Sequence, residues 1–170
     1  MSSNFVLRRA GVADIKGIHQ LLLRTAAEGL LLPRPLGDLY KHVRDFYVVS
    51  PAFDAESENM TEGGTGKRSE ILGCCALSII WDDIAEIRSL VMEDELRGLG
   101  WGAKLVDACL GEARELGLAR AFTLTYQDGF FSKLGFKVIN KDVLPNKIWA
   151  DCIHCAKFPD CDEIAMLLEL

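Results

Sequence analysis

The sequence contains no long hydrophobic run, no excess of positive charge and neither of the common glycine-rich nucleotide patterns. A membrane-spanning helix needs about 18 or more apolar residues in a row, and no such stretch is present. The formal net charge of -6 and a pI near 5.1 argue against a nucleic-acid surface. The patterns G-x-G-x-x-G and G-x-x-x-x-G-K-S/T are absent. Residues 1–4 do not open a secretory segment, so we expect a soluble, cytoplasmic protein.

The composition is that of an ordinary globular protein. Of the 170 residues, 49% are hydrophobic and 26% are charged, which suffices for one domain with a real core. Residues 54–69 are polar and almost free of apolar anchors, which indicates a flexible loop. Because strands are expected on both sides of this loop, we interpret it as an excursion within a single domain, residues 1–170.

The hydrophobic pattern alternates between the periods of strands and helices. Asp14 is a candidate N-cap for the first helix, and Gly117 is a candidate C-cap for a later one. This order of elements predicts an α/β fold, a mixed sheet with helices on both faces. The expected strands cover residues 5–8, 46–50, 70–81, 84–92, 120–126, 136–139 and 165–170. One expected helix follows Asp14, and two others cover residues 36–43 and 130–134. A further helix follows the glycine-rich stretch, and its expected apolar face consists of Trp101, Leu105, Ala108, Cys109 and Leu116.

A glycine-rich stretch, residues 97–102, lies between an expected strand and an expected helix. Glycines at such a junction let the main chain approach a ligand and leave the first amide protons of the helix unpaired. Those N–H groups and the positive end of the helix dipole form a seat for phosphate oxygens, and Arg97 can add a charge-assisted contact. A glycine-eased turn without a ligand is the alternative interpretation.

The pattern R/Q-x-x-G-x-G/A directly after the strand LVM resembles the pyrophosphate loop of the GCN5-related N-acetyltransferases (GNAT), which bind acetyl-CoA. With LVMEDELRGLGWG in the middle and GFFSKLGF near the end, the order of elements from about residue 5 to residue 139 is similar to the fold of that family. The resemblance implies a central, mixed and mostly antiparallel sheet, with acetyl-CoA as co-substrate. The residues that it implies for cofactor binding are Leu90, Val91, Met92, Arg97, Gly98, Leu99, Gly100, Trp101, Gly102 and Phe131.

Residues 28–34 and 81–90 resemble, more narrowly, the amino-acid N-acetyltransferases that make N-acetylglutamate in the first step of arginine biosynthesis. Residues 147–152 are similar to a short bacterial form of that enzyme. Longer members carry an amino-acid-kinase-like domain in front, for which this chain has no room, so we expect no regulation through such a domain. The resemblance implies acetyl transfer to the α-amine of a small amino acid, with L-glutamate as the preferred acceptor.

Acetyl transfer to an amine requires a base and a donor for the developing oxyanion, and it benefits from an acid for the leaving thiolate. Glu86 stands where the family carries its general base, and burial beside Ile84 and Ile87 would bring its basicity nearer to that of an amine. An ion pair with Arg88, on the same strand face, is an alternative that is compatible with this role. The main chain of residues 90–92 is the expected oxyanion donor.

The general acid is harder to assign, because many relatives carry a tyrosine where this sequence has Phe131. Tyr126, at the end of an expected strand, is the candidate replacement. Two alternatives stay open: a packing role for Tyr126 with a solvated hydroxyl, and departure of the thiolate without an enzymatic proton.

The two carboxylates of glutamate would need cations. Arg34 lies at a position that matches a carboxylate-binding arginine of the family, and it is held stiffly because prolines flank it. Arg88 and Lys147 are further candidates for substrate binding. Each of these residues alone is more often a solvated surface charge.

The six cysteines fall into two groups. Those expected as reduced core residues lie in apolar runs: Cys74, Cys75 and Cys109. Those near the C-terminus lie within residues 146–163: Cys152, Cys155 and Cys161. His154 or Asp162 could complete four ligands for zinc, but a single C-x-x-C is weaker evidence than a pair of them. A metal clasp, plain reduced thiols and a redox-sensitive pair therefore stay open.

The sequence thus predicts an acetyl-CoA-dependent N-acetyltransferase of a small amino acid. Two alternatives stay open: the same fold acting on a polyamine, an antibiotic or a protein N-terminus, and a non-catalytic acetyl-CoA-binding module. Arg34 and Arg88 favour an acidic acceptor over a polyamine, and Glu86 argues against a silent module. The expected partner is a small molecule, with neither nucleic acid nor membrane. The oligomeric state is left open, a homodimer included.

Overall fold

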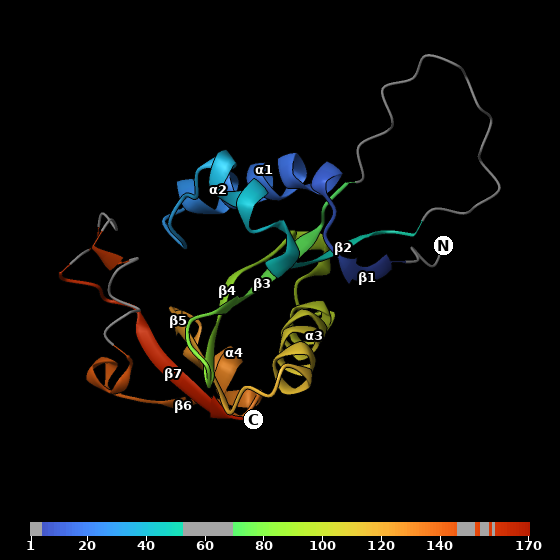
Figure 1. The fold of residues 1–170 in the computed structure, drawn as a ribbon. Coiled ribbons are helices and arrows are strands. Elements are labelled where there is room, and N and C mark those ends of the chain that lie inside the picture. Colours follow the sequence, from blue (N-terminus) through green and yellow to red (C-terminus); the bar gives the residue numbers. More distant parts are fainter. Residues whose placement is uncertain (1–4, 53–69, 146–151, 154–156, 158) are drawn as a thin grey trace, which may run out of the picture. The chain divides into compact units, whose positions relative to one another are not determined.

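The computed structural model describes residues 5–52, 70–145, 152–153, 157 and 159–170. Within this part of the chain, seven strands are hydrogen-bonded in the order β1-β2-β3-β4-β5-β7-β6 (Figure 1). The β4–β5 pairing is parallel, whereas the β1–β2, β5–β7 and β6–β7 pairings are antiparallel. The predicted mixed α/β fold is therefore confirmed.

The element boundaries agree with the sequence-based expectation to within a few residues. The strands are β1 (Phe5–Arg9), β2 (Phe46–Pro51), β3 (Gly73–Ile79), β4 (Ile84–Met92), β5 (Arg120–Thr125), β6 (Lys137–Val138) and β7 (Ile164–Glu169). The helices are α1 (Ile15–Ala27), α2 (Leu36–Lys41), α3 (Trp101–Glu115) and α4 (Asp128–Lys133). Single 3-10 turns span Val12–Asp14, Val43–Asp45, Asp94–Leu96 and Lys141–Val143.

The chain divides into two compact units, and the first comprises Met1–Cys75 with Leu90–Leu105. In this unit β1 pairs with β2 in a register that runs from Phe5↔Pro51 to Arg9↔Tyr47. Helix α1 contacts α2 and buries one apolar face, as its helical spacing predicts. The buried residues of that face are Ile15, Ile18, Leu21 and Leu22.

Asp14 directly precedes α1, as predicted, but its side chain does not cap the helix. Its carboxylate instead accepts hydrogen bonds from both terminal nitrogens of Arg8, at 2.7 and 2.9 Å, and from the main-chain N–H of Gly11 at 2.7 Å. The Asp14 side chain is only 5% exposed. The guanidinium of Arg8 holds the pKa of Asp14 below its ordinary value, with help from the Gly11 N–H and against the effect of burial. This ion pair fixes the start of α1 on β1.

Strand β3 is buried from Gly73 to Ser78, as its nearly continuous apolar run predicts. Gly73 allows a close approach, because a Cβ at this position would overlap the thioether of Met92 at the end of β4 and the flexible Met92 side chain would have to move. The Met92 side chain therefore occupies the space that the glycine leaves open. Cys74 and Cys75 follow in this strand and are buried and reduced, as is Cys109 in α3, which confirms the prediction for these cysteines.

The second unit comprises Ala76–Ser89 with Val106–Leu170. Strand β5 pairs with β7 in a register that runs from Arg120↔Glu169 to Thr125↔Ile164. Figure 1 shows β7 as the long red arrow that leads to the C-terminus. The buried core of this unit includes Ile84, Phe122, Leu144 and Ala165.

One residue expected on the buried face of α3 is exposed. Leu116 is 54% accessible to solvent, so the prediction for this side chain is wrong. The physical reason is that α3 ends at Glu115 and Gly117, with φ +77, turns the chain away. Gly117 thus acts as the terminating glycine that the sequence suggests.

Two predicted segments, the flexible loop and the cysteine-containing C-terminal segment, lie partly or wholly outside the residues that the structure describes. Residues 54–69 lie outside this part of the chain, and so do most residues of the segment 146–163 that carries the C-terminal cysteines. The interpretation of residues 1–170 as one domain stays a prediction. Among the described helices, none is long and apolar enough to cross a bilayer.

Replacing Asp14 by asparagine should destabilise the first unit, because Arg8 then loses its charged partner while the Gly11 N–H keeps an oxygen acceptor. We expect the free energy of unfolding at pH 7, measured by urea denaturation, to fall by about 2 kcal/mol. The Asp14 pKa is lower in the folded chain than in the unfolded chain. Its contribution is therefore complete above the unfolded value, about 3.9, and is lost as the pH falls through the folded value.

The difference in stability between wild type and Asp14→Asn should accordingly shrink below about pH 4. Asp107→Asn, an exposed position on α3, is the matched control and should leave stability unchanged at both pH values. A constant difference between wild type and Asp14→Asn across this range would show that the ion pair is not its source.

Candidate active site

The glycine-rich stretch before α3 adopts the open turn that the sequence predicts. Gly98 and Gly100 have φ values of +76 and +84, a region in which residues with a side chain are strained. A Cβ at either position would meet nothing within 4 Å, so the outer face of this turn is open space. The glycines are thus needed for the course of the main chain, and they leave that main chain accessible.

The N-terminus of α3 presents a row of main-chain N–H groups. The N–H groups of Leu99 and Lys104 donate to the carbonyls of Leu96 and Gly100. Across the described residues, no acceptor is found for the main-chain N–H groups of Gly98, Gly100, Trp101, Gly102 and Ala103. With the positive end of a 15-residue helix behind them, these donors can bind an anion with several oxygens.

Arg97 stabilises the turn from its side. Its Nη1 lies 2.9 Å from the Asp94 carboxylate, and its Nε donates to the Met92 carbonyl at 3.3 Å. The side chain is nevertheless 52% exposed, so part of its charge remains available. Trp101 packs its ring edge-on against Phe5 of β1, with the ring centroids 6.0 Å apart, and this contact holds the start of α3.

Glu86 and Arg88 lie on β4 and form the ion pair that the sequence offered as an alternative. Arg88 Nη1 is 3.7 Å from Glu86 Oε2, and the two side chains are 18% and 16% exposed. This distance is too long for a direct hydrogen bond, so the contact is an ion pair in which the guanidinium offsets the charge of the carboxylate. The sequence thus placed these two residues together correctly.

The pairing of β4 with β5 ends at Glu86. The register runs from Ile84↔Arg120 to Glu86↔Phe122, although β4 continues to Met92 and β5 to Thr125. Ser89 has a φ of +56, a left-handed conformation that is uncommon for a residue with a side chain and that turns a strand as a β-bulge does. The sequence carries no signal for this residue, because a serine in a strand looks ordinary.

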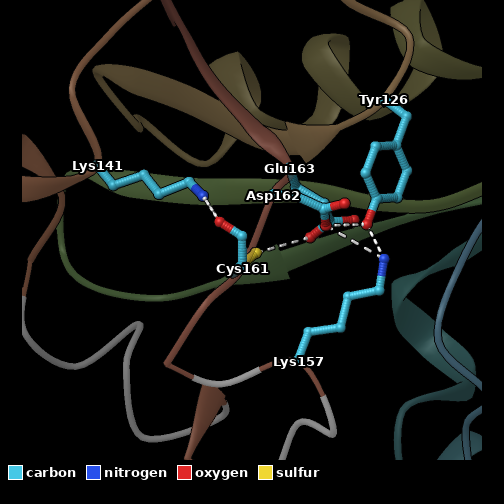
Figure 2. Close-up of polar contacts among 6 residues, drawn as sticks. All are labelled: Tyr126, Lys141, Lys157, Cys161, Asp162 and Glu163. Atoms are coloured by element: carbon cyan, nitrogen blue, oxygen red, sulfur yellow. Dashed lines mark hydrogen bonds and ion pairs between the residues drawn. The ribbon is translucent and has the colours of Figure 1, made fainter.

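Tyr126, the predicted general acid, is part of a polar cluster at the end of β5. Figure 2 shows its hydroxyl between Asp162 and Lys157. The hydroxyl donates to Asp162 Oδ1 at 2.6 Å and accepts from the Lys157 ammonium, which also lies 3.2 Å from Asp162 Oδ1. The bond to Asp162 raises the Tyr126 pKa, against the opposing effect of Lys157. A role as general acid would require this hydroxyl to exchange its partner.

The same segment contains one of the C-terminal cysteines. The Cys161 thiol lies 3.7 Å from Glu163 Oε2, and the Cys161 carbonyl accepts from Lys141 Nζ at 2.6 Å (Figure 2). Burial raises the pKa of Glu163, partly offset by the thiol contact. Within the described residues, no group of three or more histidine, cysteine, aspartate or glutamate side chains could hold a metal. His154 and Cys155 lie outside that part of the chain.

The other residues predicted for the site are Phe131, Lys147 and Arg34. Phe131 is 3% exposed and packs edge-on against Phe130 and Phe136. Lys147 lies outside the described residues. Arg34, just before α2, donates from Nη2 to Asp38 Oδ2 at 2.6 Å and is 17% exposed. Asp38 was missed by the sequence interpretation, although its spacing of four residues from Arg34 is a usable signal.

Residues 35–136 match the family model described as Acetyltransferase (GNAT) family. The chain belongs to this family. Acetyl-CoA is the acetyl donor of GNAT acetyltransferases, and the open N–H groups before α3 suit its pyrophosphate. The GNAT resemblance stated from the sequence, including its acetyl-CoA co-substrate, is therefore confirmed.

Two GNAT relatives of similar length cover most of the chain. An uncharacterized N-acetyltransferase of Chlorobaculum tepidum is 35% identical over 164 residues, which is 96% of each chain. An amino-acid acetyltransferase of Mycobacterium tuberculosis is 36% identical over 134 residues, which is 79% of this chain and 69% of that protein. The amino-acid acetyltransferase of Shewanella oneidensis is longer, and the match covers 28% of it at 29% identity.

Solved structures agree with the GNAT assignment. A Mycobacterium tuberculosis protein in complex with CoA and NLQ has a TM-score of 0.73 and 30% identity, over 97% of this chain and 99% of that one. The N-acetylglutamate synthase of Neisseria gonorrhoeae, complexed with coenzyme A and N-acetyl-glutamate, has a TM-score of 0.77. At 23% identity, and with 36% of that chain covered, the second likeness shows the fold alone.

Replacing Asp162 by asparagine should lower the pKa of Tyr126. The variant removes the carboxylate that raises this pKa and leaves the Lys157 ammonium, which lowers it. Titration of tyrosinate by ultraviolet absorbance, with Tyr126→Phe to identify the band, measures the shift. Asp160→Asn, an exposed neighbour, should leave the titration unchanged. An unaltered Tyr126 pKa in Asp162→Asn would contradict the hydrogen bond shown in Figure 2.

Proposed function

We propose that this GNAT acetyltransferase transfers the acetyl group of acetyl-CoA to the α-amine of a small amino acid, with L-glutamate as the preferred acceptor. Acetyl-CoA supplies an activated thioester, and the chain supplies binding, a base and charge stabilisation. Direct attack of the amine on the thioester needs no covalent enzyme intermediate, since holding both substrates together can lower the activation barrier by roughly 7–11 kcal/mol.

The observation that carries the proposal is the open row of N–H donors at the start of α3. Five such groups find no acceptor among the described residues, those of Gly98, Gly100, Trp101, Gly102 and Ala103. They suit a pyrophosphate, which brings several oxygens and a negative charge to the helix dipole. The exposed part of Arg97 adds a cation on the same side of the turn.

Glu86 is the proposed general base. It would take the proton from the ammonium of the acceptor, because only the neutral amine has a lone pair with which to attack the thioester carbonyl. The Glu86 side chain is largely buried, at 16% exposure, so little bulk water competes for that proton. Arg88, at 3.7 Å, would orient the carboxylate and offset its charge.

The main chain of residues 90–92 is the proposed donor to the developing oxyanion. Supporting this role, the register of β4 with β5 ends at Glu86↔Phe122, and the left-handed Ser89 redirects the strand just before Leu90. Protonation of the leaving thiolate falls to Tyr126 or to water. Tyr126 could serve only when its hydroxyl no longer donates to Asp162.

Arg34 is the residue proposed to bind a carboxylate of the acceptor, with Arg88 and Lys147 as further candidates. A carboxylate-bearing acceptor accords with the amino-acid acetyltransferases among the relatives. A polyamine, which carries only positive charge, would gain nothing from Arg34 and Arg88, whose carboxylate partners already balance their charge, whereas a carboxylate can accept from their N–H groups. This charge argument is the reason to place L-glutamate ahead of other amines and, with it, a role in arginine biosynthesis.

The test measures acetyl transfer by the purified full chain to a panel of amines. The readout is the free thiol that acetyl-CoA releases on transfer. The panel contains L-glutamate, L-glutamine, L-aspartate, spermidine and a peptide with a free N-terminus. We expect the highest kcat/KM for L-glutamate. Exclusive activity on spermidine or the peptide would overturn the acceptor assignment, and no thiol release with any amine would overturn the catalytic proposal as a whole.

Glu86→Gln should lower kcat at neutral pH by about 10²–10⁴-fold, the usual contribution of a positioned base, without raising KM for acetyl-CoA. The loss should diminish at higher pH, because more of the acceptor amine is then already deprotonated in solution. Glu115→Gln, exposed at the end of α3, is the matched control. An unchanged kcat in a folded Glu86→Gln protein would exclude the carboxylate as the base.

Arg34→Ala should raise KM for the amino acid by roughly tenfold or more, since a charge-assisted contact to a carboxylate is lost, while KM for acetyl-CoA changes little. Arg114→Ala, exposed on α3, should affect neither constant. Equal increases in both Michaelis constants would indicate a general loss of structure and would count against a specific carboxylate contact.

A further inference from the structure

Asp38 holds one end of the Arg34 guanidinium. Arg34 Nη2 donates to Asp38 Oδ2 at 2.6 Å, four residues further along the chain. The other oxygen of that carboxylate, Oδ1, lies 3.3 Å from His42 Nδ1, and the ring nitrogen is also 2.9 Å from the Asp38 main-chain carbonyl. The Asp38 carboxylate is thus fixed between two side chains, and it fixes one end of the guanidinium in turn.

The opposite end of the guanidinium carries a nitrogen that has no acceptor in the part of the chain that the structure describes. Arg34 Nη1 is fully buried, and no hydrogen-bond partner for it exists among the described residues. A buried N–H of a charged group rarely lacks an acceptor in a native protein, because its lost hydration is then uncompensated. An acceptor that arrives with a ligand would resolve this, and a planar guanidinium matches a carboxylate best.

We propose that Asp38 is a positioning residue that makes Arg34 selective for a carboxylate on the acceptor. Asp38 occupies Nη2 and restricts rotation of the flexible arginine, so that Nη1 is the nitrogen left to donate to an acceptor carboxylate. This inference rests on the proposed function for the identity of the reaction, but the carboxylate recognition itself does not require turnover. It assigns Asp38 a role through Arg34, with no contact to the substrate.

The chemistry of the buried Nη1 N–H, for which the described residues offer no acceptor, explains the selectivity. A carboxamide in place of the carboxylate offers one neutral oxygen and an NH₂ group, and the latter is a donor that faces a donor. The net charge of the Arg34–Asp38 pair is zero, so a cationic acceptor gains nothing from it. A rotating Arg34, released by loss of Asp38, could adapt to either group and would discriminate less.

The experiment compares kcat/KM for L-glutamate with that for its two monoamides, L-glutamine and L-isoglutamine, in wild type and Asp38→Asn. One of these monoamides lacks the carboxylate that Arg34 recognises, and wild type should prefer L-glutamate over it. This preference, the ratio of the two kcat/KM values, should fall by about tenfold in Asp38→Asn. This fall should come through KM for the acceptor, with kcat and KM for acetyl-CoA little changed. Asp38→Glu, which restores a carboxylate, should recover part of the preference. Asp142→Asn, an exposed aspartate outside this cluster, should behave as wild type.

A double-mutant cycle separates positioning from a general structural role. If Asp38 acts through Arg34, then Asp38→Asn should add no further loss of acceptor affinity in an Arg34→Ala background. Additive losses, or an unchanged preference between carboxylate and carboxamide in Asp38→Asn, would overturn the proposal.

A second readout is binding of L-glutamate without acetyl-CoA turnover, measured by calorimetry on wild type and Asp38→Asn. Weaker binding in the variant supports the inference even if no acetyl transfer is detected, in which case only the proposed function fails. Conversely, acetylation of an amine without any measurable binding of a carboxylate would overturn the inference and leave the acetyltransferase activity standing.

Discussion

The chemistry proposed for this protein depends on the point at which β4 stops pairing with β5. The parallel register ends at Glu86↔Phe122, and three residues later Ser89 adopts a left-handed conformation within the strand. A fully paired parallel strand would commit its main-chain donors to its neighbour. The interruption therefore divides the strand into two parts: the first pairs with β5, and the second leads into the glycine turn and the N-terminus of α3.

Each candidate cation forms an ion pair with a carboxylate close to it in the sequence. The partner lies four residues away for Arg34, two for Arg88 and three for Arg97. Such local partners limit the rotamers of a long side chain, and little extra ordering is then needed when a ligand binds. The partners also keep the net charge of each pair at zero. Under the proposed function, selectivity would therefore depend on the geometry of individual N–H groups and not on an overall positive patch, which agrees with the acidic composition.

The sequence predicted the element order, the glycine turn and the Glu86–Arg88 pair, because these follow from local periodicity and short spacing. It missed the Asp38 contact, although that spacing is equally local, because an aspartate in a short helix has many ordinary roles. Two features could not be read from the sequence at all. The left-handed Ser89 has no residue-type signature, and the cluster of Tyr126 with Lys157 and Asp162 joins residues more than thirty positions apart. Leu116 was misplaced because periodicity does not specify the last turn of a helix.

The close approach of β3 to β4 at Gly73 has a consequence for oxidative damage. The Met92 thioether fills the space above Gly73 and is nearly inaccessible, at 9% exposure. A sulfoxide oxygen on this sulfur would place a polar atom in this buried contact. Oxidation of Met92 would therefore disturb the packing of β3 against the end of β4, shortly before the turn at residues 97–102.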